Sequence, residues 1–257
     1  MNTKIFSDFG WRLLDSFEKY HQGEDGQLIV FSEDRFFNKL FQEFNYEKIT
    51  VCDFGSGLYS FLECVPRGVK KSGKSYSIRI PNWRRVLKGR AVPKIKMESY
   101  NYMFDSRRFS FKSFSWVEAI NMFDEEIVYL DADCNFFRDF TDKDFMSGLD
   151  GGDVGFFGRS NYTETGILIF NNLNRRLAGF GERIENFYSS EEIFDLEFWT
   201  DCHVFDQARV EYENELNFKN LSPSDTPHPI ALSDFSKFID HRKGPRKALE
   251  KSPEIRN

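Results

Sequence analysis

With 257 residues, 40% of them hydrophobic and 30% charged, the chain is long enough to fold around one sizeable core, in which most of its 30 phenylalanines must pack. Its net charge of −6 argues against a protein that coats nucleic acid with its whole surface. No apolar run has the length of a membrane span and the N-terminus lacks a signal-peptide core, so we expect neither secretion nor a transmembrane segment.

The cysteines also bear on location, because they are scattered along the chain and form no CxxC pair. This spacing is typical of reduced thiols in a cytoplasmic protein rather than of a disulfide framework or a zinc site. We therefore expect a cytoplasmic protein, and attachment to a membrane surface stays open. The four residues are Cys52, Cys64, Cys134 and Cys202.

The N-terminal part of the chain has the pattern of a parallel sheet. Apolar residues at helical spacing predict a helix over residues 8–20. Apolar runs predict strands over 28–31 and 48–52, and the segment 33–44 between them reads as a helix. Strand–helix–strand order is typical of parallel sheets. The glycine-containing loop over 53–57 matches no phosphate-binding fingerprint, so an ordinary turn is favoured there.

Residues 67–96 form a basic segment in an otherwise acidic chain. The segment holds eleven lysines and arginines and no acidic residue, and Tyr76 and Trp83 lie within it. It is either an anion-binding face, where an aromatic ring stacks on a base or a sugar, or a solvated insertion whose charges keep it soluble. The sequence leaves both interpretations open, so an anionic partner at this segment is one of the interactions that we consider.

The rest of the chain continues the alternation of strands and helices, which predicts one α/β domain over residues 1–257. The tail over 237–257 is basic and polar, and Pro245 and Pro253 break regular structure within it. The predicted strands cover 127–130, 153–157, 165–170 and 216–221, and the predicted helices cover 113–123, 141–146, 174–188 and 201–212.

The most informative stretch is Ile127-Val128-Tyr129-Leu130-Asp131-Ala132-Asp133, where a short apolar strand ends in two carboxylates. Ligands of open α/β sheets bind at the carboxyl ends of strands. Carboxylates at positions i and i+2 can converge on one hard divalent cation, which neutralises substrate phosphates. The alternative is that Asp131 and Asp133 cap the next helix or solvate a turn.

Five segments resemble glycosyltransferases of the GT-A fold, especially the family 8 type, in matching order along the chain. The stretch that ends in Asp131-Ala132-Asp133 resembles their metal-binding DxD segment, and Glu164-Thr165-Gly166-Ile167-Leu168-Ile169-Phe170-Asn171 resembles the strand that follows it. Arg107-Arg108-Phe109-Ser110-Phe111-Lys112 resembles the basic-aromatic stretch one helix before that strand. Asp206-Gln207 and His241-Arg242-Lys243-Gly244-Pro245-Arg246-Lys247 resemble the later acid–glutamine pair and a variant of the late His-x-x-Gly-x-x-Lys segment.

This resemblance implies a single GT-A-like domain with a mostly parallel central sheet and a tail over 237–257 that closes on the donor site. It implies transfer of a hexose from a nucleotide-diphosphate donor, with a UDP-sugar as the first choice. The acceptor, which is a glycan, a protein or a small molecule, and the oligomeric state are not fixed by the sequence. The resemblance favours retention at the anomeric carbon, although inversion stays open.

The resemblance also implies a metal site, with Asp131, Asp133 and His241 as the ligands. Imidazole suits Mn²⁺ better than Mg²⁺, so Mn²⁺ is the first expectation and Mg²⁺ the alternative. Gly244 would let the backbone approach the diphosphate, and Lys247 would neutralise it. Without the resemblance, His241 reads as a surface histidine in a polar tail.

The other implied residues surround the donor and the acceptor. The stretch from Arg107 to Lys112 supplies a cation to the diphosphate or the sugar, or else is the start of an amphipathic helix whose charges are solvated. An acidic residue beside the sugar binds its hydroxyls or, in an inverting enzyme, takes the acceptor proton. The expected donor-binding residues are Lys112, Arg108, Ala132, Glu164, Thr165, Gly166, Gly244 and Lys247, and the expected catalytic residues are Asp201, Asp206 and Gln207.

Two other functions stay open at this stage. A phosphatase of the haloacid dehalogenase type also ends a strand in D-x-D, but it usually has Thr or Val where this chain has Asn135. Phosphate release from generic phosphoesters would identify it. A nucleic-acid or polyanion-binding protein acting through residues 67–96 would bind in a salt-dependent manner, even after loss of the paired aspartates.

Overall fold

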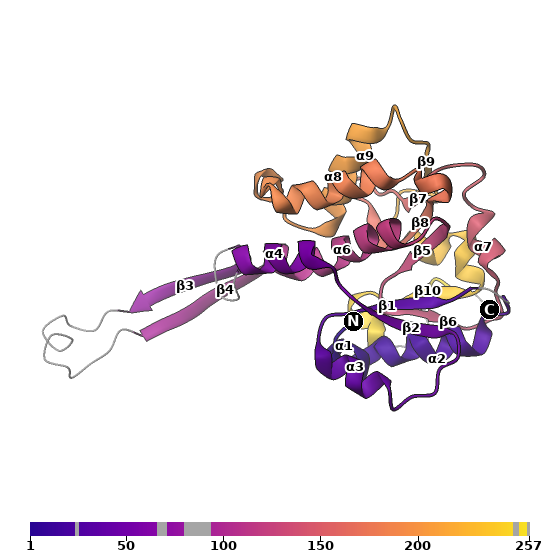
Figure 1. The fold of residues 1–257 in the computed structure, drawn as a ribbon, viewed down its shortest axis with the longest axis horizontal. Coiled ribbons are helices and arrows are strands. Elements are labelled where there is room, and N and C mark those ends of the chain that lie inside the picture. Colours follow the sequence, from indigo (N-terminus) through magenta and orange to yellow (C-terminus); the bar gives the residue numbers. More distant parts are fainter. Residues whose placement is uncertain (24–25, 66–70, 80–93, 249–251, 256–257) are drawn as a thin grey trace, which may run out of the picture.

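The computed structural model describes residues 1–23, 26–65, 71–79, 94–248 and 252–255, and helices cover both faces of its strands (Figure 1). The principal helices are α1 (Thr3–Ile5), α2 (Trp11–Tyr20), α3 (Arg35–Phe41), α4 (Ser56–Cys64), α6 (Ser106–Met122), α7 (Asp142–Met146), α8 (Ala178–Ser189) and α9 (Asp201–Tyr212). The shorter turns of helix are η1 (Phe6–Gly10), η2 (Leu173–Arg175), η3 (Glu192–Asp195), η4 (Ile230–Leu232), η5 (Asp234–Lys237) and η6 (Gly244–Ala248). The strands are β1 (Leu28–Ser32), β2 (Ile49–Asp53), β3 (Ser72–Arg79), β4 (Lys94–Asp105), β5 (Glu126–Leu130), β6 (Cys134–Phe136), β7 (Val154–Phe157), β8 (Glu164–Asn171), β9 (Phe218–Asn220) and β10 (Ile239–His241).

The largest sheet has the strand order β5-β8-β7-β9. Strand β8 pairs antiparallel with both β5 and β7, whereas β7 pairs parallel with β9. A short loop joins β7 to β8, and connections of that length favour antiparallel pairing. The pairs β1–β2, β6–β10 and β3–β4 form separate two-stranded sheets, of which only β1–β2 is parallel. The predicted α/β class is therefore confirmed, but the described sheets are small and mixed rather than mostly parallel.

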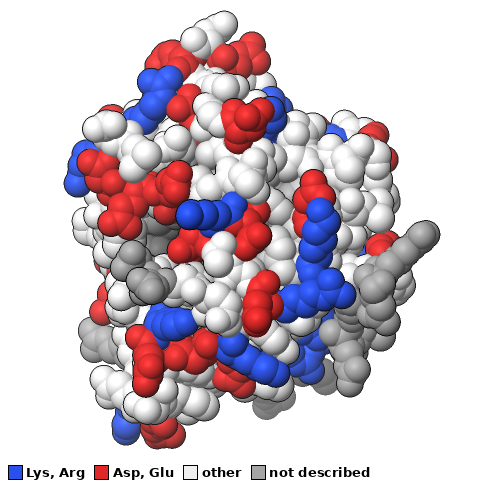
Figure 2. Space-filling view, turned by 90° about the vertical axis from the view of Figure 1, so that its right-hand side faces the viewer, with Lys and Arg blue, Asp and Glu red and all other residues white. Residues whose placement is uncertain are grey.

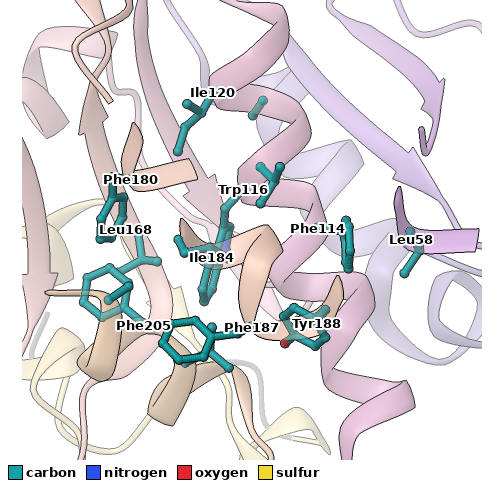
Figure 3. Close-up of a cluster of buried hydrophobic side chains, with 14 of the residues drawn as sticks. Leu58, Phe114, Trp116, Ile120, Leu168, Phe180, Ile184, Phe187, Tyr188 and Phe205 are labelled. Carbon is teal, nitrogen blue, oxygen red and sulfur yellow. The ribbon is translucent and has the colours of Figure 1, made fainter. Parts of the chain in front are cut away.

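Two hydrophobic clusters lie on opposite faces of β8, because successive side chains of a strand alternate between faces. Leu168 and Phe170 pack with residues of α6, α8 and α9, whereas Ile167 and Ile169 pack with residues of α2, β6 and η5. Figure 3 shows the first cluster, in which the indole of Trp116 is completely buried. Eighteen of the 30 phenylalanines are buried, which confirms that most of them fill core space.

The predicted helix over 113–123 begins earlier than expected, at Ser106. The side chain of Asp105 accepts a hydrogen bond from the backbone N–H of Arg108 and so caps α6 at its N-terminus. The basic-aromatic stretch 107–112 therefore forms the first turns of α6. The predicted helix over 201–212 forms with the same bounds as α9. The tail, for which the sequence predicted no strand, contains β10 before Pro245, and this strand pairs antiparallel with β6.

The basic segment is only partly described. Lys71, which pairs with Glu191, precedes β3. The other described residues of the segment belong to β3 and to the start of β4, which form a two-stranded ribbon projecting from the rest of the molecule (Figure 1). Tyr76 on this ribbon is exposed. Residues 67, 70, 84, 85, 88 and 90, which carry six of the eleven basic side chains, lie outside the described residues. Anion binding by this segment therefore stays a prediction.

Figure 2 shows the charges on one face of the molecule. On the face shown in Figure 2, basic and acidic side chains lie next to one another rather than in a patch of one sign. The described residues of that face form no extended basic surface, in keeping with the net charge of the chain. All four cysteines are free thiols. Among the described helices, none is both long enough and apolar enough to cross a membrane.

Candidate functional site

The pairing of β6 with β10 assembles a cluster of charged side chains from distant parts of the sequence. Strand β5 ends at Leu130, and the chain turns at once, with the N–H of Cys134 donating to the carbonyl of Asp131. The register of β6 and β10 places His241 opposite Cys134. The N–H of Arg242 also donates to the carbonyl of Asp133 at 3.1 Å. These backbone contacts bring the tail of the chain beside the paired aspartates.

Asp131, Asp133 and His241 converge there, with one ligand atom from each residue lying within 4.8 Å of the others. The Nε2 atom of His241 is 3.1 Å from a carboxylate oxygen of Asp133 and 3.5 Å from one of Asp131. Two carboxylates and one imidazole form a donor set that suits Mn²⁺ and leaves room for substrate oxygens. The residues present therefore fit a divalent cation.

Gly166, in β8, provides the space that the imidazole occupies. A Cβ atom at this position would lie 2.2 Å from the ring of His241, a separation that real side chains do not tolerate. The carbonyl of Gly166 accepts a hydrogen bond of 2.8 Å from the N–H of Asp131. Gly166 thus supports two of the three residues of the candidate metal site. Its carbonyl binds the N–H of Asp131, and its lack of a side chain leaves space for the ring of His241.

Lysine side chains neutralise the carboxylates of the cluster. The ammonium group of Lys112, on α6, lies 2.9 Å from Asp131 and 3.0 Å from Asp201. Lys247 lies 2.9 Å from Asp133. The hydroxyl of Tyr129 donates a further hydrogen bond of 2.9 Å to Asp131. Each aspartate of the candidate metal site is therefore paired with a lysine ammonium group.

This environment shifts the protonation of the cluster. Burial alone would raise the pKa of Asp131, but the charge of Lys112 and a hydrogen bond from His241 hold it well below its usual range. Burial would likewise lower the pKa of His241, but the charge of Asp133 and hydrogen bonds to both aspartates raise it to about 10. At neutral pH the imidazole therefore carries a proton, and a metal that binds to it must displace that proton.

Glu164, the first residue of β8, forms a second buried group of ion pairs. Its carboxylate lies 2.9 Å from Arg159 and 2.9 Å from Lys243, and the Nδ1 atom of His241 is 3.8 Å away. Burial would raise the pKa of Glu164, but the charges of His241, Lys243 and Arg159 lower it. Because Lys243 belongs to the tail and Arg159 to the loop before β8, Glu164 joins both segments to the sheet.

Asp201, the first residue of α9, is buried beside this cluster. Thr165 donates a hydrogen bond to it and also lies 3.3 Å from the thiol of Cys202. The side chain of Thr200 caps the helix by accepting from the N–H of His203. The helix start thus fixes Asp201 next to Lys112 and Thr165.

The other residues expected from the sequence lie at varying distances from this cluster. Asp206 accepts hydrogen bonds from the N–H and the hydroxyl of Thr163, so it supports the loop that precedes Glu164. Gln207 is exposed and donates to Glu211 on the outer face of α9. Arg107 donates to the carbonyls of two residues near the end of α4 and so joins that helix to α6.

The remaining expected residues line a cavity of about 1780 Å³. Gly244 within its lining has a φ of +60°, with open space where a Cβ would be. Arg108 lines the cavity and is exposed, which leaves its guanidinium accessible to an anion. Ala132, between the two aspartates, lines it as well. The cavity is also lined by Lys112, Asp131, Asp133, Glu164, Thr165, Asp201, His241 and Lys247.

Sequence reasoning missed three residues of the site. Tyr129 precedes Asp131 by two positions on a strand, so both side chains point to one face, and this spacing could have identified it. Lys243 is likewise two positions after His241. Arg159 lies in a loop whose sequence carries no signal, and only the fold brings it to Glu164.

Comparison with protein-family profiles and with curated proteins finds no match to this chain. Among solved structures, the fold is similar to the crystal structure of mouse xyloside xylosyltransferase 1 in its apo form. The two chains share 14% sequence identity with a TM-score of 0.46, over 85% of this chain and 80% of that chain. A likeness at this level establishes neither family membership nor activity, so a functional assignment depends on the geometry of the site.

Proposed function

We propose that this protein is a metal-dependent glycosyltransferase that moves a sugar from a nucleotide-diphosphate donor, most readily a UDP-sugar, to an acceptor hydroxyl. The observation that carries the proposal is the convergence of Asp131, Asp133 and His241 in a cavity that also holds several lysines. In the reaction, the bond between the anomeric carbon and the diphosphate oxygen breaks and its electron pair stays on the diphosphate. A bond forms from the acceptor oxygen to the anomeric carbon, and the hydroxyl proton passes to the departing diphosphate or to water.

Asp131, Asp133 and His241 would hold the cation, with Mn²⁺ as the first choice and Mg²⁺ as the alternative. A bound cation would supply Lewis-acid stabilisation of the negative charge that develops on the leaving diphosphate. Glu164 faces the other nitrogen of the imidazole at 3.8 Å. A carboxylate in that position holds a metal-binding histidine in one ring orientation.

Cations of the cavity are suited to bind the diphosphate itself. Lys247 is within reach of the phosphates once the pair with Asp133 opens, and Arg108 is already exposed to the cavity. An arginine can bind two phosphate oxygens at once, which fixes orientation as well as charge. The left-handed backbone at Gly244 leaves space above the chain for a phosphate to approach. In this proposal the tail over 237–257 closes on the donor.

Asp201 and Thr165 are the residues best placed to bind hydroxyl groups of the transferred sugar. Asp201 is engaged by Lys112 at 3.0 Å, and both oxygens of Asp206 are engaged by Thr163. Carboxylates held in this way are poor acceptors for the proton of an incoming hydroxyl. This arrangement supports retention of configuration, for which such a base is not required. The proposal assigns no catalytic role to Gln207, which is exposed and donates a hydrogen bond to Glu211 on the same helix.

The proposal includes a cytoplasmic setting, which the four free thiols support. It is tested by incubating the protein with Mn²⁺ and a panel of nucleotide-sugars and measuring release of the nucleoside diphosphate by mass spectrometry. We expect slow hydrolysis of one donor in the absence of an acceptor, and none after Asp131→Asn or Asp133→Asn. Phosphate release from p-nitrophenyl phosphate, without turnover of any nucleotide-sugar, would instead identify a phosphatase and refute the proposal.

A further inference from the structure

A row of aromatic rings begins with Tyr162 at the edge of the cavity, and its rings belong to neither hydrophobic cluster of the described residues. Ring centroids of Tyr162 and His203 are 5.7 Å apart, those of His203 and Phe198 are 5.1 Å apart, and those of Phe198 and Phe104 are 5.6 Å apart. All four rings are partly exposed. Tyr162 lines the cavity that holds the candidate metal site. We call these four residues the aromatic row.

Contacts behind the row hold its rings in place. The hydroxyl of Thr200 forms a hydrogen bond of 2.8 Å with Nδ1 of His203. The guanidinium of Arg159 packs over the ring of Tyr162 at 4.5 Å and also pairs with buried Glu164. The N–H of Trp199 donates to the carbonyl of Met103, which joins the segment before α9 to β4. Because these rings are fixed before any ligand arrives, binding to them costs little ordering entropy.

The surroundings of the row favour a neutral ligand over an anionic one. Burial lowers the pKa of His203 although Asp206 and Glu197 act in the opposite direction, so its ring is uncharged at neutral pH. Charges of both signs balance near the row, because Arg159 packs on Tyr162 and Arg209 lies 3.5 Å from Asp206, so no net positive charge attracts phosphate or sulfate groups. A sugar ring is neutral, and its C–H groups form an apolar face that packs flat on an aromatic ring, while its hydroxyls stay free to form hydrogen bonds.

We propose that the aromatic row is an acceptor subsite that binds a carbohydrate, with sugar rings stacked on Tyr162 and Phe198 and the reactive hydroxyl directed toward Thr165 and Asp201. This inference rests on the proposed function and names the class of its acceptor. Two contacts tie the row to the cluster: Arg159 packs on Tyr162 and pairs with Glu164, and Thr200, which bonds to His203, lines the cavity together with Asp201. A carbohydrate bound to the row would therefore extend to Thr165 and Asp201, beside which the donor sugar would be held.

The experiment is a binding measurement on an array of defined glycans, probed with the full chain in the presence of Mn²⁺ and UDP. Glycans that bind are then titrated in solution by saturation-transfer NMR against four variants. Tyr162→Leu and Phe198→Leu keep apolar volume but remove the flat face. Tyr162→Phe keeps the ring. Phe36→Ala removes an aromatic side chain that is 79% exposed on α3, far from the row in sequence.

We expect the wild-type chain to bind glycans, and the two leucine variants to weaken that binding at least about fivefold, as loss of a ring contact does elsewhere. Tyr162→Phe and Phe36→Ala should bind as the wild type does. Absence of glycan binding, or equal binding by all variants, overturns the inference. So does salt-dependent binding confined to sulfated glycans, which would point to the basic segment.

A second readout separates this inference from the proposed function. The melting temperature of every variant is measured with and without UDP and Mn²⁺. If the leucine variants keep the wild-type shift, their donor site is intact and any loss of glycan binding belongs to the aromatic row. If the wild type shows the nucleotide shift but binds no glycan, the acceptor subsite is refuted while the proposed transferase stands. If neither the shift nor glycan binding is seen, both are refuted.

Discussion

The Nε2 atom of His241 lies 3.1 Å from the carboxylate of Asp133, although the two residues are far apart in the sequence. The contact exists because β10 pairs with β6 immediately after the turn that carries both aspartates. A three-residue strand near the end of the chain therefore completes the candidate metal site. We therefore expect the affinity of this candidate site for a metal to depend on how firmly β10 is paired with β6.

Gly166→Ala should weaken metal binding, because the added methyl group would overlap the ring of His241 and displace it from the aspartates. We expect the dissociation constant for Mn²⁺ to rise about tenfold or more, the size of effect seen when the support of a metal ligand is lost. Titration of free Mn²⁺ by electron paramagnetic resonance measures it. Gly148→Ala is the matched control, because its methyl group meets its neighbours at ordinary contact distances. Equal affinity in both variants contradicts the packing role of Gly166.

Lys112→Met should destabilise the fold, because it leaves the carboxylates of Asp131 and Asp201 without their shared cation. Removing one partner of a buried ion pair typically costs about 3–5 kcal/mol of unfolding free energy. Urea denaturation without metal measures the loss. Lys237→Met, which breaks an exposed pair with Asp234, should cost less than about 1 kcal/mol. If Lys112→Met lowers the unfolding free energy by as little as the control does, the buried ion pairs of Lys112 contribute little to stability.

Lys247→Met should strengthen Mn²⁺ binding in the absence of nucleotide but weaken the cooperation between Mn²⁺ and UDP. Lys247 pairs with Asp133 at 2.9 Å, so it competes with a cation for that carboxylate. Its removal should tighten Mn²⁺ binding in the absence of nucleotide. It should also reduce the gain in Mn²⁺ affinity that UDP confers, because the released lysine no longer neutralises the diphosphate.

The same titration, with and without UDP, tests this pair of effects for Lys247→Met. Lys219→Met, which affects an exposed pair with Asp150, serves as the control and should leave both affinities unchanged. Weaker Mn²⁺ binding in the absence of UDP would mean that Lys247 supports the structure of the site rather than competing for it.

Cys202 should resist alkylation at ordinary pH. Burial, and then the charge of Asp201, raise the pKa of its thiol to about 12. The reactive form is the thiolate, so at pH 8 only about one thiol in ten thousand can react, and the rate should rise with pH toward that pKa. Mass spectrometry after treatment with iodoacetamide should find exposed Cys64 modified and Cys202 intact. Rapid modification of Cys202 in the folded protein would contradict its burial beside Asp201.

The elements that the sequence predicts well have strong local signals. The strand before Asp131 is a continuous apolar run, and the helix that starts at Asp201 follows a threonine that caps it. In α9 the adjacent residues Asp206 and Gln207 point in different directions, as helix geometry requires. Asp206 faces Thr163, and Gln207 faces solvent.

The parts that the sequence predicts poorly depend on contacts between distant residues. Strand β10 lies in a polar segment, and only its pairing with β6 makes it a strand. The mixed pairing of the central sheet likewise depends on which strands become neighbours, which local patterns do not encode. The ion pairs of Glu164 involve a loop arginine and a tail lysine whose surroundings have no periodicity. Residue types alone could not have selected them.

The measurement that tests the central claim most directly is the melting temperature of the wild type and of Asp133→Asn, with UDP, with Mn²⁺, and with both. Ligands that bind the folded state raise the melting temperature, by an amount that grows with the logarithm of the ligand concentration divided by the dissociation constant. We predict no shift for the wild type with UDP alone, and a shift with UDP and Mn²⁺ together that exceeds the shift with Mn²⁺ alone; in Asp133→Asn this added shift should be absent. An equal shift in the variant, or a UDP shift independent of Mn²⁺, would contradict a metal site at Asp131, Asp133 and His241.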